Sequence, residues 1–140
     1  MSLVLDSSTT LGWIYGDETT EAIRDVFDKV AEAGATVPSL WRLEVANSLT
    51  VAIRRRRIDP AFRDAALTDL ALLDIAVDQQ TDVRAWTDTL GLADRFRLSV
   101  YDAAYLELAH RRQLALATLD AELARAAASL GVDVVGFLAS

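Results

Sequence analysis

Short apolar runs alternate with longer segments of helical periodicity along this chain of 140 residues. The apolar runs are typical of strands buried on both faces of a parallel sheet, and the periodic segments between them favour amphipathic helices. Strands that alternate with helices predict an α/β fold, in which a parallel sheet is sandwiched between helices. The expected strands are 4–6, 35–37, 73–77, 114–118 and 132–135.

Capping residues mark where several of the helices begin and end. Asp59 is a good N-cap with Pro60 as the first helical residue, while Gly34 and Gly131 are placed to terminate the helices before them. The segment 91–98 is ambiguous and is interpreted as a helix end followed by a loop. The expected helices are 7–15, 17–33, 39–57, 60–72, 79–90, 99–112 and 121–130.

Composition indicates a small protein with one hydrophobic core. Because the chain is short and 52% hydrophobic, residues 1–140 are expected to form a single domain. Cysteine is absent, which excludes disulfides, thiolate metal sites and a cysteine nucleophile. The N-terminus has no positively charged segment, and no apolar stretch is long enough to span a bilayer. We therefore expect a cytoplasmic protein with no membrane partner.

The chain is acidic overall but basic at one place. A net charge of −7 argues against non-specific binding to nucleic acids, whereas the four consecutive arginines 54–57 can bind phosphate whatever the total charge is. Three interpretations of this run stay open: a solvated helix end, a contact surface for RNA phosphate, and a contact surface for an acidic partner segment.

Two aspartates directly follow expected strands. Asp6 ends the apolar run that begins at Leu3, and Asp120 ends the run from Leu114 to Leu119. Because open α/β sheets place their sites at the carboxyl ends of parallel strands, both carboxylates are expected at the same edge. Each aspartate also has a structural interpretation, as the N-cap of the helix that follows it.

Glu44 lies inside an expected helix among mostly apolar neighbours, an unusual place for a charge without a partner. It shares one helical face with Trp41 and Asn47, so burial of the tryptophan directs Glu44 and Asn47 toward the interior or a cleft. An ion pair with Arg42 or Arg54 is the structural alternative, although Arg42 falls on a different face of the helix.

Asp102 also lies in an expected helix, three residues after Ser99, which resembles a capping box and explains the aspartate structurally. If Asp102 converges with Asp6, Glu44 and Asp120, the four carboxylates form a dense patch of negative charge. The natural partner for such a patch is a hard divalent cation.

Other chemistries lack the residues that they need. The only histidine, His110, excludes a zinc site of three histidines and leaves no obvious serine–histidine–aspartate arrangement. The only lysine, Lys29, lies in the middle of a helix, and no glycine-rich phosphate loop follows any strand. Carboxylates with hydroxyl and amide groups remain, which indicates metal-assisted hydrolysis with Mg²⁺ or Mn²⁺.

Four motifs, in order along the chain, resemble a PIN domain, and most closely the VapC-type toxins of bacterial type II toxin–antitoxin pairs. The resemblance covers essentially the whole chain, and the set of motifs is more specific than any one of them. The motifs are Val4-Leu5-Asp6-Ser7-Ser8, Trp41-x-x-Glu44-x-x-Asn47, the segment YDAAYLELA at 101–109, and Thr118-Leu119-Asp120-Ala121-Glu122-Leu123.

The resemblance implies a three-layer Rossmann-like fold with a mostly parallel sheet, and a Mg²⁺- or Mn²⁺-dependent endoribonuclease. It implies RNA as substrate, a cognate antitoxin as partner and a homodimer, to which Trp13, Ile14 and Tyr15 are expected to contribute. Whether Glu122 joins the site stays open. By this likeness the catalytic and metal-binding acids are Asp6, Glu44, Asp102 and Asp120, with polar support from Ser8, Asn47 and Thr118.

Three other classes of protein share the α/β pattern. A receiver-like domain would need a lysine after a later strand and paired acids after the first, and the chain has neither. A phosphatase of the haloacid dehalogenase type would need a second aspartate two residues after Asp6, where Ser8 stands. The more serious alternative is a non-catalytic PIN-like binding module whose acids are structural.

Overall fold

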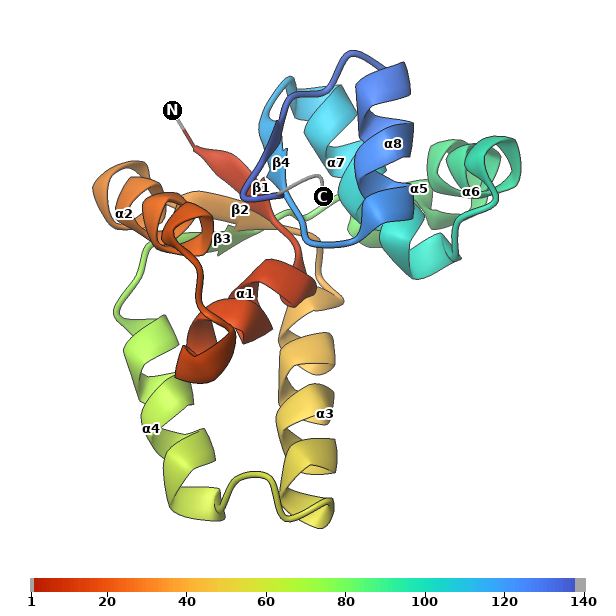
Figure 1. Cartoon of the computed structure of the whole chain (residues 1–140). Helices are drawn as coiled ribbons and strands as arrows, with labels where there is room; N and C mark the ends of the chain where they lie inside the picture. Colours follow the sequence, from red (N-terminus) through yellow and green to blue (C-terminus); the bar gives the residue numbers. More distant parts are fainter. Residues whose placement is uncertain (1, 138–140) are drawn as a thin grey trace.

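A computed structural model describes residues 2–137, whose strands assemble into a five-stranded sheet (Figure 1). All neighbouring strands pair in parallel, which confirms the predicted α/β fold. Across the sheet the strands are β3 (Ile75–Val77), β2 (Ala35–Val37), β1 (Leu3–Leu5), β4 (Ala115–Ala117) and β5 (Val134–Val135).

The first strand lies at the centre of the sheet and sets the position of the site. Its residues Leu3, Val4 and Leu5 are all buried, as a continuous apolar run predicts for a strand covered on both faces. Leu5 pairs with Ala117 of β4. Because the two strands run in the same direction, the segments that follow them leave the sheet at the same edge.

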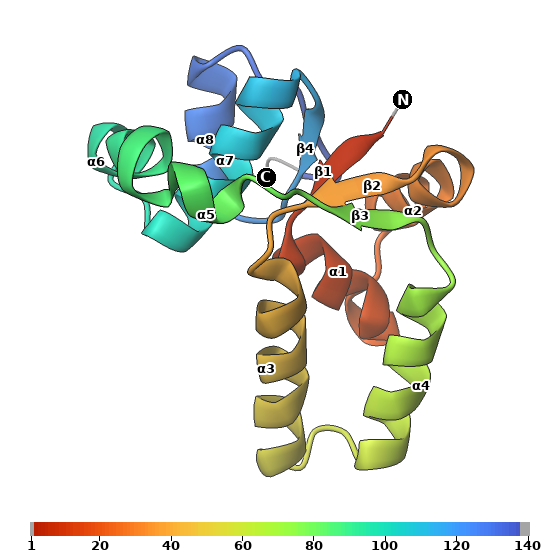
Figure 2. The ribbon, with the colours of Figure 1, turned by 180° about the vertical axis from the view of Figure 1, so that it is seen from behind.

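The segments between the strands form the helices α1 (Ser7–Ile14), α2 (Glu21–Ala33), α3 (Trp41–Arg54), α4 (Pro60–Ala71), α5 (Thr81–Arg84), α6 (Leu90–Phe96), α7 (Val100–Arg112) and α8 (Ala121–Ser129). Helix α7 packs against β1 and β4 and also contacts α8, whereas α1 contacts α2 and α3. Figures 1 and 2 show α3 and α4 projecting together from the sheet, joined by a loop at their far end. Within residues 2–137, no helix combines the length and apolarity that crossing a bilayer requires.

The helix expected at 17–33 is divided in the structure. A 3₁₀ turn, Gly16–Glu18, comes first, and α2 begins only after Thr20, whose hydroxyl accepts a hydrogen bond from the N–H of Ile23 (3.2 Å). The hydroxyl of Thr19 donates to the carbonyl oxygen of Gly12 (3.0 Å). Because both threonines bond to main-chain groups, they interrupt the helix that the acidic residues alone suggested.

The prediction for residues 79–98 was wrong in its second half. Helix α5 continues through a π-helical turn, Ala85–Thr89, into α6, so the segment expected to be a loop is mostly helical. Both the π-helical turn and α6 contact α7, and this packing outweighs the weak helix propensity of Gly91. The helix ends at Arg97, which adopts a left-handed conformation (φ 55°).

The helix ends predicted at Gly34 and Asp59 are confirmed. The carboxylate of Asp59 accepts a hydrogen bond from the N–H of Phe62 (2.8 Å), with Pro60 as the first helical residue. Gly34 has a φ of 79°, and a Cβ atom there would lie 2.9 Å from the carbonyl oxygen of Asp74. Glycine suits this position because it tolerates both the conformation and the close approach.

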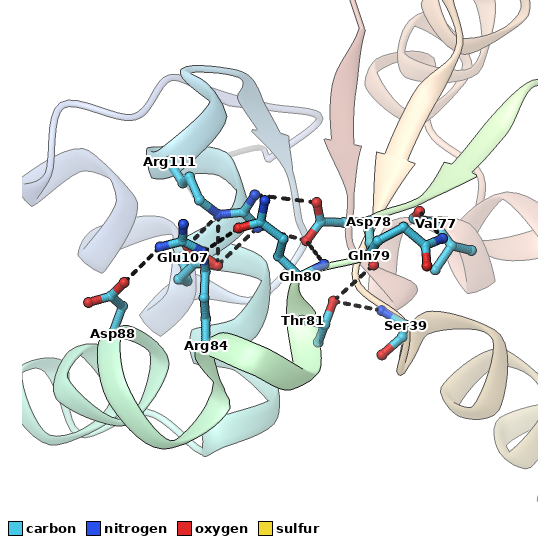
Figure 3. A network of polar contacts seen from close by, with 10 residues as sticks. All are labelled: Ser39, Val77, Asp78, Gln79, Gln80, Thr81, Arg84, Asp88, Glu107 and Arg111. Carbon is cyan, nitrogen blue, oxygen red and sulfur yellow. Dashed lines mark hydrogen bonds and ion pairs between the residues drawn. The ribbon is translucent and has the colours of Figure 1, made fainter.

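A buried ion-pair network fastens the loop after β3 to α7 (Figure 3). The guanidinium of Arg111 lies 2.7 Å from Asp78 and 2.8 Å from Glu107, whose side chains are 7% and 6% exposed. The two carboxylates can be buried because the arginine between them supplies the opposite charge. This compensation is the feature that separates Asp78 and Glu107 from Asp6, Glu44, Asp102 and Asp120.

Candidate active site

Asp6 is the buried centre of a polar cluster at the carboxyl end of β1. Its side chain does not cap α1; instead its Oδ2 atom accepts hydrogen bonds from the hydroxyls of Ser8 and Thr118, both at 2.7 Å. Asp6 is only 3% exposed, and this burial raises the pKa of its carboxyl, with a further contribution from the charge of Asp120. Because both hydroxyls donate to the same oxygen, they hold the carboxylate of Asp6 in one orientation.

The same two hydroxyls tie the end of β4 to the end of β1. The hydroxyl of Thr118 accepts a hydrogen bond from the N–H of Asp120 (3.0 Å), and the hydroxyl of Ser8 accepts one from the N–H of Leu119 (3.0 Å). Ser8 and Thr118, named from the sequence as polar support, thus connect the segments that carry Asp6 and Asp120. These hydrogen bonds together set the relative position of Asp6 and Asp120.

Asp120 is an N-cap and also faces the cluster. Its Oδ1 atom accepts hydrogen bonds from the N–H groups of Glu122 (2.9 Å) and Leu123 (3.0 Å) at the start of α8, so the capping interpretation holds for this residue. Within residues 2–137 its Oδ2 atom accepts no hydrogen bond. Capping therefore occupies one oxygen of the carboxylate and leaves the other for a ligand.

Glu44 is held in the first turn of α3 by a tyrosine that the sequence did not single out. The hydroxyl of Tyr105 donates a hydrogen bond of 2.6 Å to Oε1 of Glu44, and the hydroxyl of Ser7 lies 3.4 Å from the same atom. Partial burial raises the pKa of Glu44, the charge of Asp6 raises it further, and the Tyr105 hydrogen bond opposes both effects. Its carboxylate forms no ion pair with an arginine of residues 2–137.

The helix face proposed for Glu44 is anchored by Trp41, which is buried as expected. The indole N–H of Trp41 donates to the hydroxyl of Thr10 in α1 (3.0 Å). Asn47 is exposed, and no hydrogen bond within the described chain joins its amide to the acids. The structure therefore brings Glu44 to the cluster and leaves Asn47 one turn further along α3.

Asp102 lies in the first turn of α7, where its N–H donates to the hydroxyl of the capping residue Ser99 (3.0 Å). Burial, followed by the charges of Asp6, Asp120 and Glu44, raises the pKa of its carboxyl from 3.8 to about 6. The charges of the three other acids therefore all act on Asp102, which makes the four carboxylates one electrostatic cluster.

Two other residues considered in the sequence lie outside the cluster or at its margin. Glu122 is exposed and contributes its N–H to the Asp120 cap. His110 is exposed in the last turn of α7, as expected for a helix end. Tyr105 could have been noticed only as a hydroxyl in a buried apolar stretch one turn after Asp102, because its partner Glu44 is 61 residues away.

The donor atoms around the cluster have the chemistry of a hard-cation site. None of the four acids pairs with lysine or arginine within residues 2–137, and the side-chain partners of Asp6 and Glu44 are hydroxyl groups. Oxygen donors fit Mg²⁺ or Mn²⁺. In this part of the chain, however, no three acidic or histidine side chains are arranged as a ready-made metal site. Joint coordination therefore requires the acids to approach one another more closely than they do here.

The sequence profile of the PIN domain matches residues 3–129. The chain belongs to the PIN domain family. PIN domains are generally nucleases and generally use divalent metal ions. A search of curated proteins finds no significant match to this sequence.

Solved structures with low sequence identity share the PIN-like fold. The chain is similar to PAE2754 from Pyrobaculum aerophilum, with a TM-score of 0.67, 22% identity and coverage of 90% of this chain and 84% of that one. It is similar to a toxin–antitoxin complex from Klebsiella pneumoniae, with a TM-score of 0.61, 13% identity and coverage of 99% and 97%. A third is VapBC2 from Rickettsia felis bound to a DNA fragment from its promoter, with a TM-score of 0.64, 11% identity and coverage of 96% and 97%.

Proposed function

We propose that this PIN domain is a Mg²⁺- or Mn²⁺-dependent endoribonuclease and the toxin of a toxin–antitoxin pair. The observation that carries the proposal is the clustering of Asp6, Glu44, Asp102 and Asp120 without a cationic side chain among residues 2–137. Uncompensated carboxylates are costly in a folded protein unless a ligand supplies positive charge. A divalent cation bound here would lower the pKa of a water molecule and offset charge on the scissile phosphate.

The chain's own side chains divide into rigid and adjustable groups. Asp6 and Asp120 are fixed by Ser8, Thr118 and the start of α8, so we assign them to hold the cation. Asp102, with a pKa of about 6, is ionised yet basic at neutral pH, which suits the residue that orients and deprotonates the attacking water. Glu44 completes the set of cation ligands.

The antitoxin enters the proposal through the structural relatives, and RNA enters it through the resemblance to VapC-type toxins. Two of the similar structures are of a toxin–antitoxin complex and of VapBC2, and each covers nearly all of this chain. A toxin of this kind would act on cellular RNA in the cytoplasm and would be held inactive by its antitoxin. The substrate and the partner are testable separately from metal binding, because they require different molecules in the assay.

A homodimer is part of the proposal, with a contact surface different from the one suggested by the sequence. Trp13 stacks on Phe27 at 4.4 Å within the chain, and Tyr15 is buried, so these aromatic residues are already packed. Trp86 and Val83 are 90% and 76% exposed beside each other in the segment before α6. We propose that a second subunit covers this apolar surface. Light scattering of Trp86→Ser should give a monomer where the wild type gives a dimer; a monomeric wild type would contradict this part.

A non-catalytic binding module remains the competing function, and two observations favour it. Asp120 already has a structural role as a cap, and Asp6 has two hydroxyl partners. In that case the acids would stabilise the fold without binding metal. The two functions differ in whether charge, as opposed to hydrogen bonding, is needed at these positions.

The test is cleavage of single-stranded RNA by purified protein with Mn²⁺, with EDTA, and with an Asp102→Asn variant. Asparagine keeps the shape of the side chain and removes the charge, so the variant should fold normally and lose cleavage. Asp28→Asn, on the exposed face of α2, is the matched control and should cleave like the wild type. Wild-type protein that leaves RNA intact with Mn²⁺ would reject the enzyme, and an Asp102→Asn variant that still cleaves would reject the role assigned to Asp102.

A further inference from the structure

A groove of about 310 Å³ lies where the end of α1 meets the second half of α3. Its lining includes the polar side chains of Asn47 and Ser48 and the basic side chains of Arg55 and Arg57, with Tyr15 on the α1 side. The groove therefore has a polar end toward the start of α3 and a positively charged end at the close of that helix.

The groove continues the helix face that carries Glu44. Residues 44, 48, 51 and 55 are spaced by four, three and four positions, which places them on one stripe of α3. From Glu44 to Arg55 the helix rises about 16 Å, at 1.5 Å per residue. A stacked nucleic-acid strand rises by about 3.4 Å per nucleotide along its axis, so about five nucleotides cover that length. The basic end is thus within reach of a strand whose reactive phosphate lies at the acids.

The arginines at the end of α3 are not equivalent. Arg57 is held in place by an ion pair to Glu18 (2.9 Å), and its guanidinium lies 3.9 Å from the ring centroid of Tyr15. Within residues 2–137, Arg54, Arg55 and Arg56 have no ion-pair partner and are exposed. Arg57 therefore builds the wall of the groove, while the charges of Arg55 and Arg56 are available to a ligand.

Arg56 occupies a backbone position that favours glycine. It has a φ of 59°, and the N–H groups of Arg56 and Arg57 bond to the carbonyl oxygens of Ile53 and Ala52, both at 2.9 Å. Helices often place glycine in this arrangement after their last turn, because a side chain in the left-handed region costs free energy. An arginine here has a cost for the fold, as Arg97 and Gln113 have at the ends of α6 and α7.

We propose that Arg55, at the end of this groove, and Arg56, which lines the adjoining pocket that shares Tyr15 and Arg57 with it, form a binding subsite for the phosphate backbone of single-stranded RNA. The subsite rests on the proposed nuclease function and extends it, since it positions the strand a few nucleotides from the acids. An acidic cluster in a chain of net charge −7 repels RNA, and the arginines at the end of the helix that carries Glu44 offset that repulsion. The same charge complementarity assigns the subsite to phosphates along a strand and not to a single nucleotide.

The experiment measures binding of a labelled single-stranded oligoribonucleotide by fluorescence anisotropy, across salt concentrations from about 50 to 200 mM. The Asp6→Asn background prevents cleavage during the measurement, and Mn²⁺ is present throughout. Loss of two phosphate contacts should reduce the slope of log Kd against log salt by about 1.4, at about 0.7 per contact. The Arg55→Gln/Arg56→Gln protein should show this change and bind several-fold more weakly at low salt, while a dinucleotide should bind it as well as the parent.

Two comparisons separate the subsite from general effects of charge and folding. The Arg24→Gln/Arg112→Gln protein loses the same net charge from exposed positions on α2 and α7 and should keep the parental slope. Arg56→Gly should melt no lower than the parent, because glycine suits this backbone, and yet reduce the slope by about 0.7.

Several outcomes would overturn the subsite. These are an unchanged slope in the Arg55→Gln/Arg56→Gln protein, an equal change in the Arg24→Gln/Arg112→Gln protein, and loss of binding to an oligoglutamate peptide with RNA binding intact. The last result would assign the groove to an acidic protein segment. If wild-type protein fails to cleave RNA but the slopes change as expected, the subsite stands and the nuclease proposal falls.

Discussion

The hydroxyl of Tyr105 donates a 2.6 Å hydrogen bond to Oε1 of Glu44, linking the buried middle of α7 to the first turn of α3. Tyr105 has no exposed surface, and burial together with this hydrogen bond raises the pKa of its hydroxyl, which therefore stays protonated as a donor. The bond occupies one oxygen of Glu44 and fixes the direction in which the other can act. Tyr105 is thus a positioning residue for the carboxylate.

Tyr105→Phe should weaken Mn²⁺ binding by about 10- to 100-fold, the range typical of removing a hydrogen-bonding partner of a metal ligand. The fold should lose about 1 kcal/mol, because Glu44 is partly exposed and water can replace part of the lost hydrogen bond. Isothermal titration of the metal-free protein measures the first effect and urea unfolding the second. Tyr101→Phe, at an exposed position of the same helix, is the control and should leave Mn²⁺ affinity unchanged. Equal affinities for the wild type and Tyr105→Phe would remove Tyr105 from the site.

Asp6→Asn and Asp120→Asn should change thermal stability in opposite directions with and without metal. In EDTA each variant should melt at a higher temperature than the wild type, because one of several mutually repelling charges is gone. Asparagine at position 120 can keep the cap on α8, so lost capping should not mask the gain. With Mn²⁺ at a hundredfold excess over its Kd the wild type should gain about 2.7 kcal/mol and the variants less. The acids would be structural if Mn²⁺ left the melting temperature of the wild type unchanged and both variants were less stable than the wild type.

Asp102 should make the metal-free protein less stable as pH rises toward neutrality. Its pKa is raised from 3.8 to about 6 in the folded state, so between these values the folded state binds more protons than the unfolded state. The free energy of unfolding therefore falls as pH rises from about 4 to about 6 and then levels off. Urea unfolding in EDTA at several pH values, for the wild type and Asp102→Asn, isolates this contribution. The variant should show a smaller decline across that window; parallel curves would mean that Asp102 does not titrate as inferred.

Arg111→Met should destabilise the fold by about 3 to 5 kcal/mol, because it leaves Asp78 and Glu107 buried without a counter-charge. Urea unfolding provides the measurement. Arg84→Met is the matched control, since Arg84 pairs with the exposed carboxylate of Asp88 at 2.8 Å. Such an exposed pair is worth at most about 1 kcal/mol, so the control should lose little. Similar losses in the two variants would show that burial of the network does not determine its contribution.

Much of the fold follows from local pattern in the sequence. All five strands were predicted, because a short apolar run buried on both faces is recognisable without knowledge of its neighbours. The ends at Gly34 and Asp59 were also predictable, since capping depends on residues within one turn. The helical structure within the segment 91–98 was not predictable, because it depends on contacts with α7.

In the candidate site, the position of Asp120 could be predicted from the sequence, whereas the role of Tyr105 became visible only in the tertiary structure. The approach of Asp6 and Asp120 could be inferred, because both follow parallel strands and such strands end at one edge. Three other features could not be inferred from the sequence: the Tyr105–Glu44 hydrogen bond, the Arg111 network and the groove beside Arg55. Each depends on how helices distant in sequence pack together, which is decided by the shape of many side chains at once. The sequence by itself thus determined the strands and the sheet edge, and the tertiary structure decided the helix at 90–96 and which helix faces meet at that edge.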